Sequence, residues 1–182
     1  VSGHYTRDAL DIDLVQLARR AGARLALGAA CGIDRDAHLI EIDGRPPLGY
    51  DVASLDIGIT SAMPDLPGFA AHAMPATPLG ALADAWAQYL KATGPARIAV
   101  IGGGVAGAEL SMAMAHAMRI QGRVAQIHLI DRGQVASGMR ARTGQKLRAA
   151  LRRNGVEVHE NAEPVEVAAG YLLLSNGTRI EA

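Results

Sequence analysis

Hydrophobic residues recur at two spacings along the chain, and the change from one spacing to the other predicts a mixed α/β protein. Apolar residues three or four positions apart predict helices over residues 7–21, 79–92, 105–121 and 140–153. Short apolar or alternating runs predict strands over residues 24–27, 38–42, 50–60, 97–101 and 126–130. Strands that alternate with helices in this order favour a parallel sheet.

Turn-forming residues set the ends of the predicted elements. Thr6 is placed to cap the first helix, and Gly22 can end it in a left-handed conformation. Beyond residue 156, alternating apolar residues surround Asn176-Gly177, a pair that favours a tight hairpin turn. Prolines concentrated over residues 61–80 predict a linker. We therefore expect an antiparallel hairpin region in addition to the parallel sheet.

A glycine-rich segment over residues 101–109 lies between an apolar strand and an amphipathic helix. In its Gly-x-Gly-x-x-Gly spacing, Gly102 permits a tight turn, Gly104 leaves space for a pyrophosphate and Gly107 lets the helix approach the strand. The helix start directs unpaired N–H groups and roughly half a positive charge toward the phosphates. The segment therefore predicts a dinucleotide site, and a glycine-rich turn without a ligand is the alternative. The expected phosphate contacts are Gly102, Gly103, Gly104, Val105, Ala106 and Gly107.

The helix that follows this segment has an apolar stripe that we expect to face the sheet. The members of the stripe share helical spacing, and they are Ala106, Leu110, Ala113, Ala117 and Ile120. They are expected to pack on the strand over residues 97–101, whose apolar run is typical of a strand buried on both faces.

The strand over residues 126–130 is followed by an acidic residue, Asp131, which lies 24 residues after Gly107. A carboxylate at this position accepts hydrogen bonds from the 2′-hydroxyl of a ribose. It also repels a 2′-phosphate, by up to about 4 kcal/mol for unit charges about 4 Å apart near a protein surface. Asp131 therefore favours NAD(H) over NADP(H), whereas the adjacent Arg132 could receive a 2′-phosphate. Glu109 on the first helical turn has two open roles, interaction with the helix dipole or a position near the nicotinamide.

A weak internal repeat relates the two ends of the chain. A shift of 133 residues without a gap places Gly22 on Gly155 and Leu39 on Leu172, and it superposes the first and last predicted helices. Few residues are identical, so chance is the alternative. If the repeat is real, the first copy lacks the glycine segment that begins the second copy at Gly102. We therefore expect the sequence to be an excerpt of a longer protein.

Composition excludes several function classes. The formal net charge is +0 with Lys and Arg scattered, so no nucleic-acid-binding surface is expected. The single cysteine, Cys31, excludes an internal disulfide or paired-cysteine redox centre and is expected to be a semi-buried thiol. The 6 histidines show no metal-ligand spacing, so no metal site is predicted. No apolar run approaches the roughly 20 residues needed to cross a bilayer, which favours a cytoplasmic protein.

The glycine segment over residues 100–109 resembles the nicotinamide domain of the FAD-dependent pyridine nucleotide-disulfide oxidoreductase superfamily. Ser54–Gly58 and Pro64–Gly68 are similar to its type II NADH dehydrogenase-like branch, especially to the flavoprotein portion fused to selenide, water dikinase in some bacteria. In that family an NAD domain interrupts the FAD domain. The resemblance therefore implies that residues 1–62 are a partial FAD-binding domain and residues 63–182 an NAD-binding domain lacking its last strand.

The implied fold is a three-layer FAD/NAD(P)-binding Rossmann-like α/β fold, with a parallel sheet plus a small antiparallel β-meander, incomplete at both ends. The implied activity is that of an FAD-dependent NADH dehydrogenase or related NAD(P)H oxidoreductase. It passes hydride from NADH to the flavin and on to an acceptor such as a quinone or another small molecule. No residue is assigned a catalytic role. The resemblance implies NAD contacts at Gly102, Gly104, Gly107, Glu109 and Asp131. The full set of expected cofactor contacts also includes Gly103, Val105, Ala106 and Arg132.

The resemblance also implies FAD in the full-length protein, whereas the fragment alone is expected to be inactive because it contains no FAD phosphate segment. Selenide, water dikinase is an implied fused or separate partner, and a homodimer is compatible with the family. The basic helix over residues 140–153 has a solvated face as its simplest explanation and contact with the inner face of the membrane as the alternative. An NAD(H)-binding sensor without turnover and a methyltransferase are the alternative functions.

Overall fold

The chain forms two compact units in a computed structural model, which describes residues 1–58 and 64–182. The larger unit comprises Val1–His4 and Ile59–Ala182, and the smaller unit comprises Tyr5–Gly58. The domain boundary predicted between residues 62 and 63 lies outside the described residues. No helix among the described residues is long and apolar enough to cross a bilayer.

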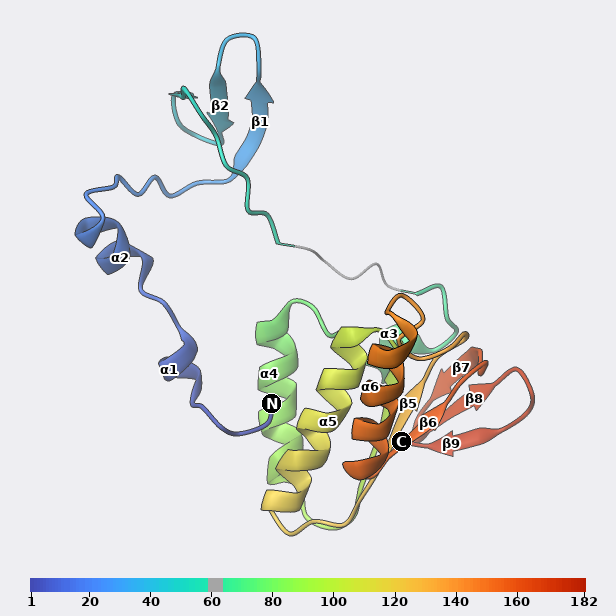
Figure 1. Cartoon of the computed structure of the whole chain (residues 1–182). Helices are drawn as coiled ribbons and strands as arrows, with labels where there is room; N and C mark the ends of the chain where they lie inside the picture. The colour runs from blue at the N-terminus through green and yellow to red at the C-terminus, as the bar shows by residue number, and fades with distance from the viewer. Residues whose placement is uncertain (59–63) are drawn as a thin grey trace. The chain divides into compact units, whose positions relative to one another are not determined.

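The larger unit is built on a parallel sheet of three strands in the order β4-β5-β6. These strands are β4 (Ala96–Ile101), β5 (Ala125–Ile130) and β6 (Val156–His159). Helices α5 (Val105–Ile120) and α6 (Ala141–Arg153) cover one face of the sheet, and α4 (Leu79–Lys91) lies beside α5 (Figure 1). The three helices and the parallel strands predicted in this part of the chain are confirmed to within two residues at each end.

The opposite face of the sheet is covered by an antiparallel meander of β7 (Pro164–Ala168), β8 (Tyr171–Leu174) and β9 (Arg179–Glu181). Leu172, Leu174 and Ile180 of the meander pack against Ile130 of the sheet, together with Phe69 from the short helix α3 (Phe69–His72). The turn between β8 and β9 contains Gly177 at φ +82°, which confirms the predicted hairpin. The three-layer α/β architecture with a parallel sheet and a small meander is therefore confirmed.

The face of α5 that packs on the sheet differs from the predicted stripe. Ala106 and Ile120 are exposed, whereas the buried positions are Ala108, Ser111, Met114, Ala115, Ala117 and Met118. The rotation of the helix is set by its contact with the glycine bend, because a methyl group added at Gly107 would overlap the carbonyl oxygen of Gly102. Residues at helical spacing from this contact therefore face the sheet.

The smaller unit contains α1 (Arg7–Leu10) and α2 (Leu14–Arg20), followed by an antiparallel meander. The single helix predicted over residues 7–21 is therefore wrong. The Asp13 carboxylate accepts hydrogen bonds from the backbone N–H groups of Val15 and Gln16 at 2.9 and 3.0 Å, which starts a second helix at this point. The expected roles of the flanking residues are confirmed, since Thr6 Oγ1 accepts from Ala9 N at 3.3 Å and Gly22 has φ +64°.

The meander of the smaller unit consists of β1 (Ala30–Asp34), β2 (Leu39–Ile42) and β3 (Leu48–Gly49). The strands predicted over residues 24–27 and 50–58 are wrong, and residues 59–60 lie outside the described residues. Both runs are apolar, but the described part of this unit contains no parallel sheet that could pair with their backbone groups. Their large side chains, including Leu27 and Val52, are consequently exposed.

The two meanders support the predicted internal repeat. A shift of 133 residues moves β1 to residues 163–167, within one residue of the bounds of β7. The same shift moves β2 to residues 172–175, within one residue of the bounds of β8. In both meanders the middle strand pairs antiparallel with the strand before it and the strand after it. A shared arrangement over this length favours duplication over chance.

Candidate functional site

The glycine bend, Gly102–Gly104, lies between the end of β4 and the start of α5. Gly102 has φ +109°, a conformation that L side chains rarely adopt, and its N–H donates to the carbonyl oxygen of Ile130 at 2.8 Å. Gly107 packs directly on the bend, where only hydrogen fits between helix and strand. The roles predicted for Gly102 and Gly107 in the turn and in the close packing therefore match the observed geometry.

The space in front of the first turn of α5 is open. Gly104 is the N-terminal cap of α5. Among the residues that the structure describes, no side chain caps this helix end, and a Cβ added at Gly104 would meet nothing within 4 Å. Val105 and Ala106 are exposed beside it. A 16-residue helix whose first N–H groups lack a capping side chain offers donors and a positive dipole end to an anion.

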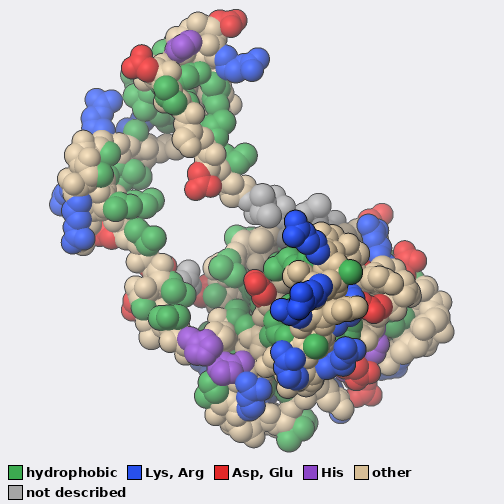
Figure 2. Space-filling view, in the orientation of Figure 1, with side chains coloured by type: hydrophobic (Ala, Val, Ile, Leu, Met, Phe, Trp, Pro, Cys, Tyr) green, Lys and Arg blue, Asp and Glu red, His purple; other side chains and the backbone are tan. Residues whose placement is uncertain are grey.

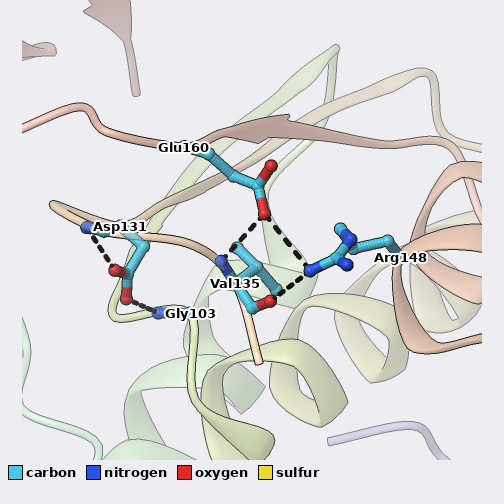
Figure 3. Close-up of polar contacts among 6 residues, drawn as sticks. Gly103, Asp131, Val135, Arg148 and Glu160 are labelled. Carbon is cyan, nitrogen blue, oxygen red and sulfur yellow. Dashed lines mark hydrogen bonds and ion pairs between the residues drawn. The ribbon is translucent and has the colours of Figure 1, made fainter. Parts of the chain in front are cut away.

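Asp131, directly after β5, connects the bend to the next loop (Figure 3). Its Oδ2 accepts from Gly103 N at 2.6 Å and its Oδ1 accepts from Gly133 N at 2.7 Å. Gly103 itself is buried against Asp131 and Val135, and any side chain there would displace one of them. Each carboxylate oxygen retains a second lone pair. The half-buried carboxylate is therefore held beside the bend with acceptor capacity left for a hydroxyl group.

A second set of polar contacts holds the β5–α6 loop in place (Figure 3). Glu160 Oε1 accepts from Val135 N at 2.9 Å, and Arg148 Nη1 donates to Val135 O at 2.7 Å. The guanidinium of Arg148 also lies 3.6 Å from Glu160, and Val135 is fully buried. Ala136 N donates to Gly103 O at 2.9 Å, so this loop is hydrogen-bonded to the glycine bend and helps to fix its conformation.

Arg148 and Glu160 were not expected at the site. Most basic residues of α6 are exposed, as predicted for a solvated face, and Figure 2 shows Lys and Arg side chains gathered over this helix. Arg148 differs, because its side chain is only 25% exposed. Its spacing relative to buried Gly144 and Leu151, four before it and three after it, places it toward the sheet and was the available signal.

The predicted cofactor contacts fall into two groups. Gly102, Gly103, Gly104, Val105, Ala106 and Gly107 form the bend and the first turn of α5, and Asp131 joins them through Gly103. Glu109 and Arg132 are exposed, and neither has a hydrogen bond or ion pair within the described part of the chain. Both roles considered for Glu109 remain compatible with its position.

Three further side chains behave differently from expectation. Cys31 is exposed, so its prediction as a semi-buried thiol is wrong, because the described part of the smaller unit contains no buried residue that could cover β1. His128 and His159, which show no ligand spacing in sequence, lie on adjacent parallel strands with Nδ1 and Nε2 3.0 Å apart. Burial lowers the pKa of His128 below its ordinary value, an effect that Glu157 opposes and His159 reinforces.

A large apolar cavity of about 830 Å³ lies elsewhere in the larger unit. It follows the edge of β4 that pairs with no other strand among the described residues. Its lining includes Trp86, Tyr89, Met114 and Val167, and neither the glycine bend nor Asp131 lines it. The Tyr89 hydroxyl lies 3.1 Å from both the N and the O of Arg97 on that edge. The open space at the start of α5 and the apolar cavity are therefore separate features.

The model of the family described as pyridine nucleotide-disulphide oxidoreductase matches residues 13–182. Among solved structures, a NAD-dependent persulfide reductase from A. fulgidus matches with a TM-score of 0.75 and 18% identity, over 100% of this chain and 36% of its own. The reduced CoADR-RHD protein of Bacillus anthracis matches with a TM-score of 0.72 and 19% identity, over 97% of this chain and 32% of its own. Putidaredoxin reductase, in its covalent complex with putidaredoxin, matches with a TM-score of 0.69 and 19% identity, over 100% of this chain and 45% of its own.

At these identities the structural matches show a shared fold, and none of the curated proteins compared with the chain matches it. The chain spans between 32% and 45% of the length of the structures named above. The family model covers nearly the whole chain, including both meanders and the glycine bend. The chain therefore belongs to the pyridine nucleotide-disulphide oxidoreductase family.

Proposed function

We propose that this chain is the NAD(H)-binding portion of an FAD-dependent oxidoreductase. The observation that carries the proposal is the glycine bend at the start of α5, with Asp131 bonded to Gly103 at 2.6 Å. The bend offers uncapped N–H groups and open space where a diphosphate needs both. Family membership supports the same conclusion, since the family name includes pyridine nucleotides.

Each part of the site has a proposed task. The N–H groups from Gly104 to Gly107 bind the diphosphate, and Gly104 keeps the approach free because a side chain there would occupy the space of the phosphates. The remaining lone pairs of Asp131 accept hydrogen bonds from the adenosine ribose. The negative charge of Asp131 disfavours a 2′-phosphate, so we propose NAD(H) as the preferred nucleotide, with Arg132 as the residue that weakens the preference.

The chemistry comes from the cofactors: a nicotinamide supplies hydride, and a flavin held by the full-length protein accepts it and reduces a further acceptor. This chain's residues bind and orient the nucleotide, and none of them is assigned a proton-transfer or nucleophilic role. Glu109, exposed two residues beyond Gly107, is the proposed contact near the nicotinamide. The proposed acceptor is a quinone or another small molecule, as in the type II NADH dehydrogenase-like branch.

The domain assignment is part of the same proposal. Residues 1–62 are proposed to belong to the FAD-binding domain, whose remaining segments would cover the exposed apolar side chains of the smaller unit, such as Leu27 and Val52. The free edge of β4, with its apolar cavity, is the proposed pairing site of the strand that completes the NAD-binding domain. The resemblance to this branch supports three further proposals. They are a partnership with the enzyme selenide, water dikinase, the formation of a homodimer, and peripheral contact with a membrane.

Calorimetric titration of the chain with NADH and NADPH tests the proposal. The informative variant is Gly104→Val, because φ at Gly104 is −68° and an added Cβ meets nothing within 4 Å. We therefore expect the fold to tolerate the change. The matched control is Gly49→Val, which also meets nothing within 4 Å but lies in the smaller unit. We expect NADH binding by the wild type and the control, at least tenfold weaker binding by Gly104→Val, and weaker binding of NADPH than of NADH. Equal binding of NADH by Gly104→Val and wild type would exclude this site.

A further inference from the structure

We propose that His128, Glu157 and His159 form a binding site for a divalent transition-metal ion. The three residues come from two adjacent parallel strands, and their nitrogen and oxygen atoms all lie within 4.8 Å of one another. His128 is opposite Glu157 in the β5–β6 register, and His159 is opposite Ile130, so all three point to the same face of the sheet. The site shares no residue with the glycine bend and does not depend on nucleotide binding.

The distances between the donor atoms fit a tetrahedral ion. Metal–nitrogen and metal–oxygen distances of about 2.0–2.2 Å place neighbouring ligand atoms of a tetrahedron about 3.3–3.5 Å apart. His128 Nδ1 and His159 Nε2 are 3.0 Å apart. His128 Nδ1 lies 3.5 Å from Glu157 Oε2, and His159 Nε2 lies 3.5 Å from Glu157 Oε1, so each ring faces a different oxygen of the carboxylate. Rotation of the exposed carboxylate, so that one oxygen faces both rings, and a shift of a few tenths of an ångström between the rings would give a triangle of the size that such an ion requires.

The donor set also selects the ion. Two imidazole nitrogens and one carboxylate are typical ligands of zinc and related late transition metals, whereas calcium and magnesium prefer oxygen ligands alone. Three protein ligands leave a fourth position of a tetrahedron for water or another small ligand. The rings are half-buried, and the carboxylate is exposed at 66%, so an ion could enter from the Glu157 side without opening the core.

The present contact between the rings is compatible with exchange for a metal ion. Two imidazole nitrogens 3.0 Å apart share one proton, with one ring as donor and the other as acceptor. For metal binding the donor ring changes to the tautomer that carries its proton on the other ring nitrogen, so that both facing lone pairs point toward the ion. The ligands lie in regular strands whose backbone is held in place, because Leu129 beside them belongs to the buried core and Val158 packs against it.

Metal binding to the full chain, freed of metal by a chelator and dialysis, tests the proposal. Calorimetric titration with Zn²⁺ is expected to show one equivalent bound per chain, and Co²⁺ is expected to give the intense visible absorption of a four-coordinate site. Glu157→Gln replaces a strong ligand on an exposed position without changing its shape and should weaken Zn²⁺ binding roughly tenfold or more. His159→Asn should abolish stoichiometric binding.

The matched control is His38→Asn, which removes an exposed histidine from the smaller unit at φ 56°, a conformation that Asn tolerates. This variant should bind Zn²⁺ as the wild type does. Far-ultraviolet circular dichroism checks the fold of each variant, and Glu157→Gln decides the matter if His159→Asn unfolds. Absence of Zn²⁺ binding at 100 µM, or wild-type affinity in Glu157→Gln, would overturn the proposal.

Discussion

The two units contain related elements but differ in how they bury them. In the larger unit, Leu172 of the meander is 2% exposed and Leu147 of α6 packs against the core. Their counterparts at a shift of 133 residues are Leu39, which is half-buried, and Leu14, which is 59% exposed. The larger unit has a parallel sheet between helix and meander, and the described part of the smaller unit has none. In this chain the helix and the meander that enclose a sheet have buried side chains, whereas their counterparts without a sheet do not.

The largest expected difference between the two units is the loss of stability when a leucine side chain is removed. Leu129 is 0% exposed in the central strand β5, and Leu129→Ala should lower the free energy of unfolding by about 2–5 kcal/mol. The matched variant Leu27→Ala, at a side chain 69% exposed in the smaller unit, should change it by less than about 0.5 kcal/mol. Urea unfolding, followed by Trp86 fluorescence and circular dichroism, measures both. An equal loss in Leu27→Ala would mean that the smaller unit has a core of its own.

The second largest expected difference is between alanine substitutions at a glycine of the larger unit and at one of the smaller unit. Gly107→Ala forces a methyl group against the carbonyl of Gly102 and should destabilise the larger unit by about 1–3 kcal/mol while weakening NADH binding. Gly49→Ala, in open space, should do neither. Thermal unfolding and NADH titration of both variants check this. Wild-type stability in Gly107→Ala would show that α5 and β4 are not in the close contact described above.

The two aspartates that bond to backbone N–H groups provide a third contrast. Asp131→Asn leaves one amide acceptor for two N–H groups and should cost about 1–3 kcal/mol in stability, with weaker NADH binding. Asp13→Asn should be close to neutral, because Asn caps a helix about as well as Asp. Unfolding curves and NADH titrations of the two variants measure the contrast. Unchanged NADH affinity in Asp131→Asn would remove Asp131 from the nucleotide site.

The smallest effect concerns pH. Burial lowers the folded-state pKa of His128 below 6.5, so the unfolded chain binds the additional proton first as pH falls. The stability contributed by neutral His128 is therefore full above pH 6.5 and is lost as pH falls from 6.5 toward the folded pKa, by at most about 1.4 kcal/mol per pH unit. Unfolding in metal-free buffer from pH 7.5 to 5 should show this loss, and His128→Asn should lose the His128 contribution. His38→Asn should keep the wild-type slope, and an identical slope in His128→Asn would contradict the assignment.

The sequence predicts the larger unit well because its signals are local and agree with one another. The apolar run of β4, the glycine bend and the helix after it each favour the same arrangement. The wrong predictions concern elements whose structure depends on contacts with residues distant in the sequence. Residues 24–27 have the composition of a strand but no sheet to join, and the face of α5 depends on the contact between Gly107 and Gly102.

The candidate site is predicted only in part, for the same reason. Gly102, Gly107 and Asp131 follow from a known spacing. Arg148 and Glu160 do not, because they act on a loop through backbone groups that are distant in sequence. The juxtaposition of histidines on β5 and β6 likewise depends on strand register, which becomes visible only when the strands are paired.

The most direct test of the central claim is a two-dimensional amide NMR titration of the ¹⁵N-labelled chain with NADH. If the start of α5 binds the diphosphate, the amide resonances of Gly103, Gly104, Val105, Ala106 and Gly107 should shift most, with those of the β5–α6 loop following. Shifts confined to residues around the β4 edge cavity, or no shifts at millimolar NADH, would contradict the claim.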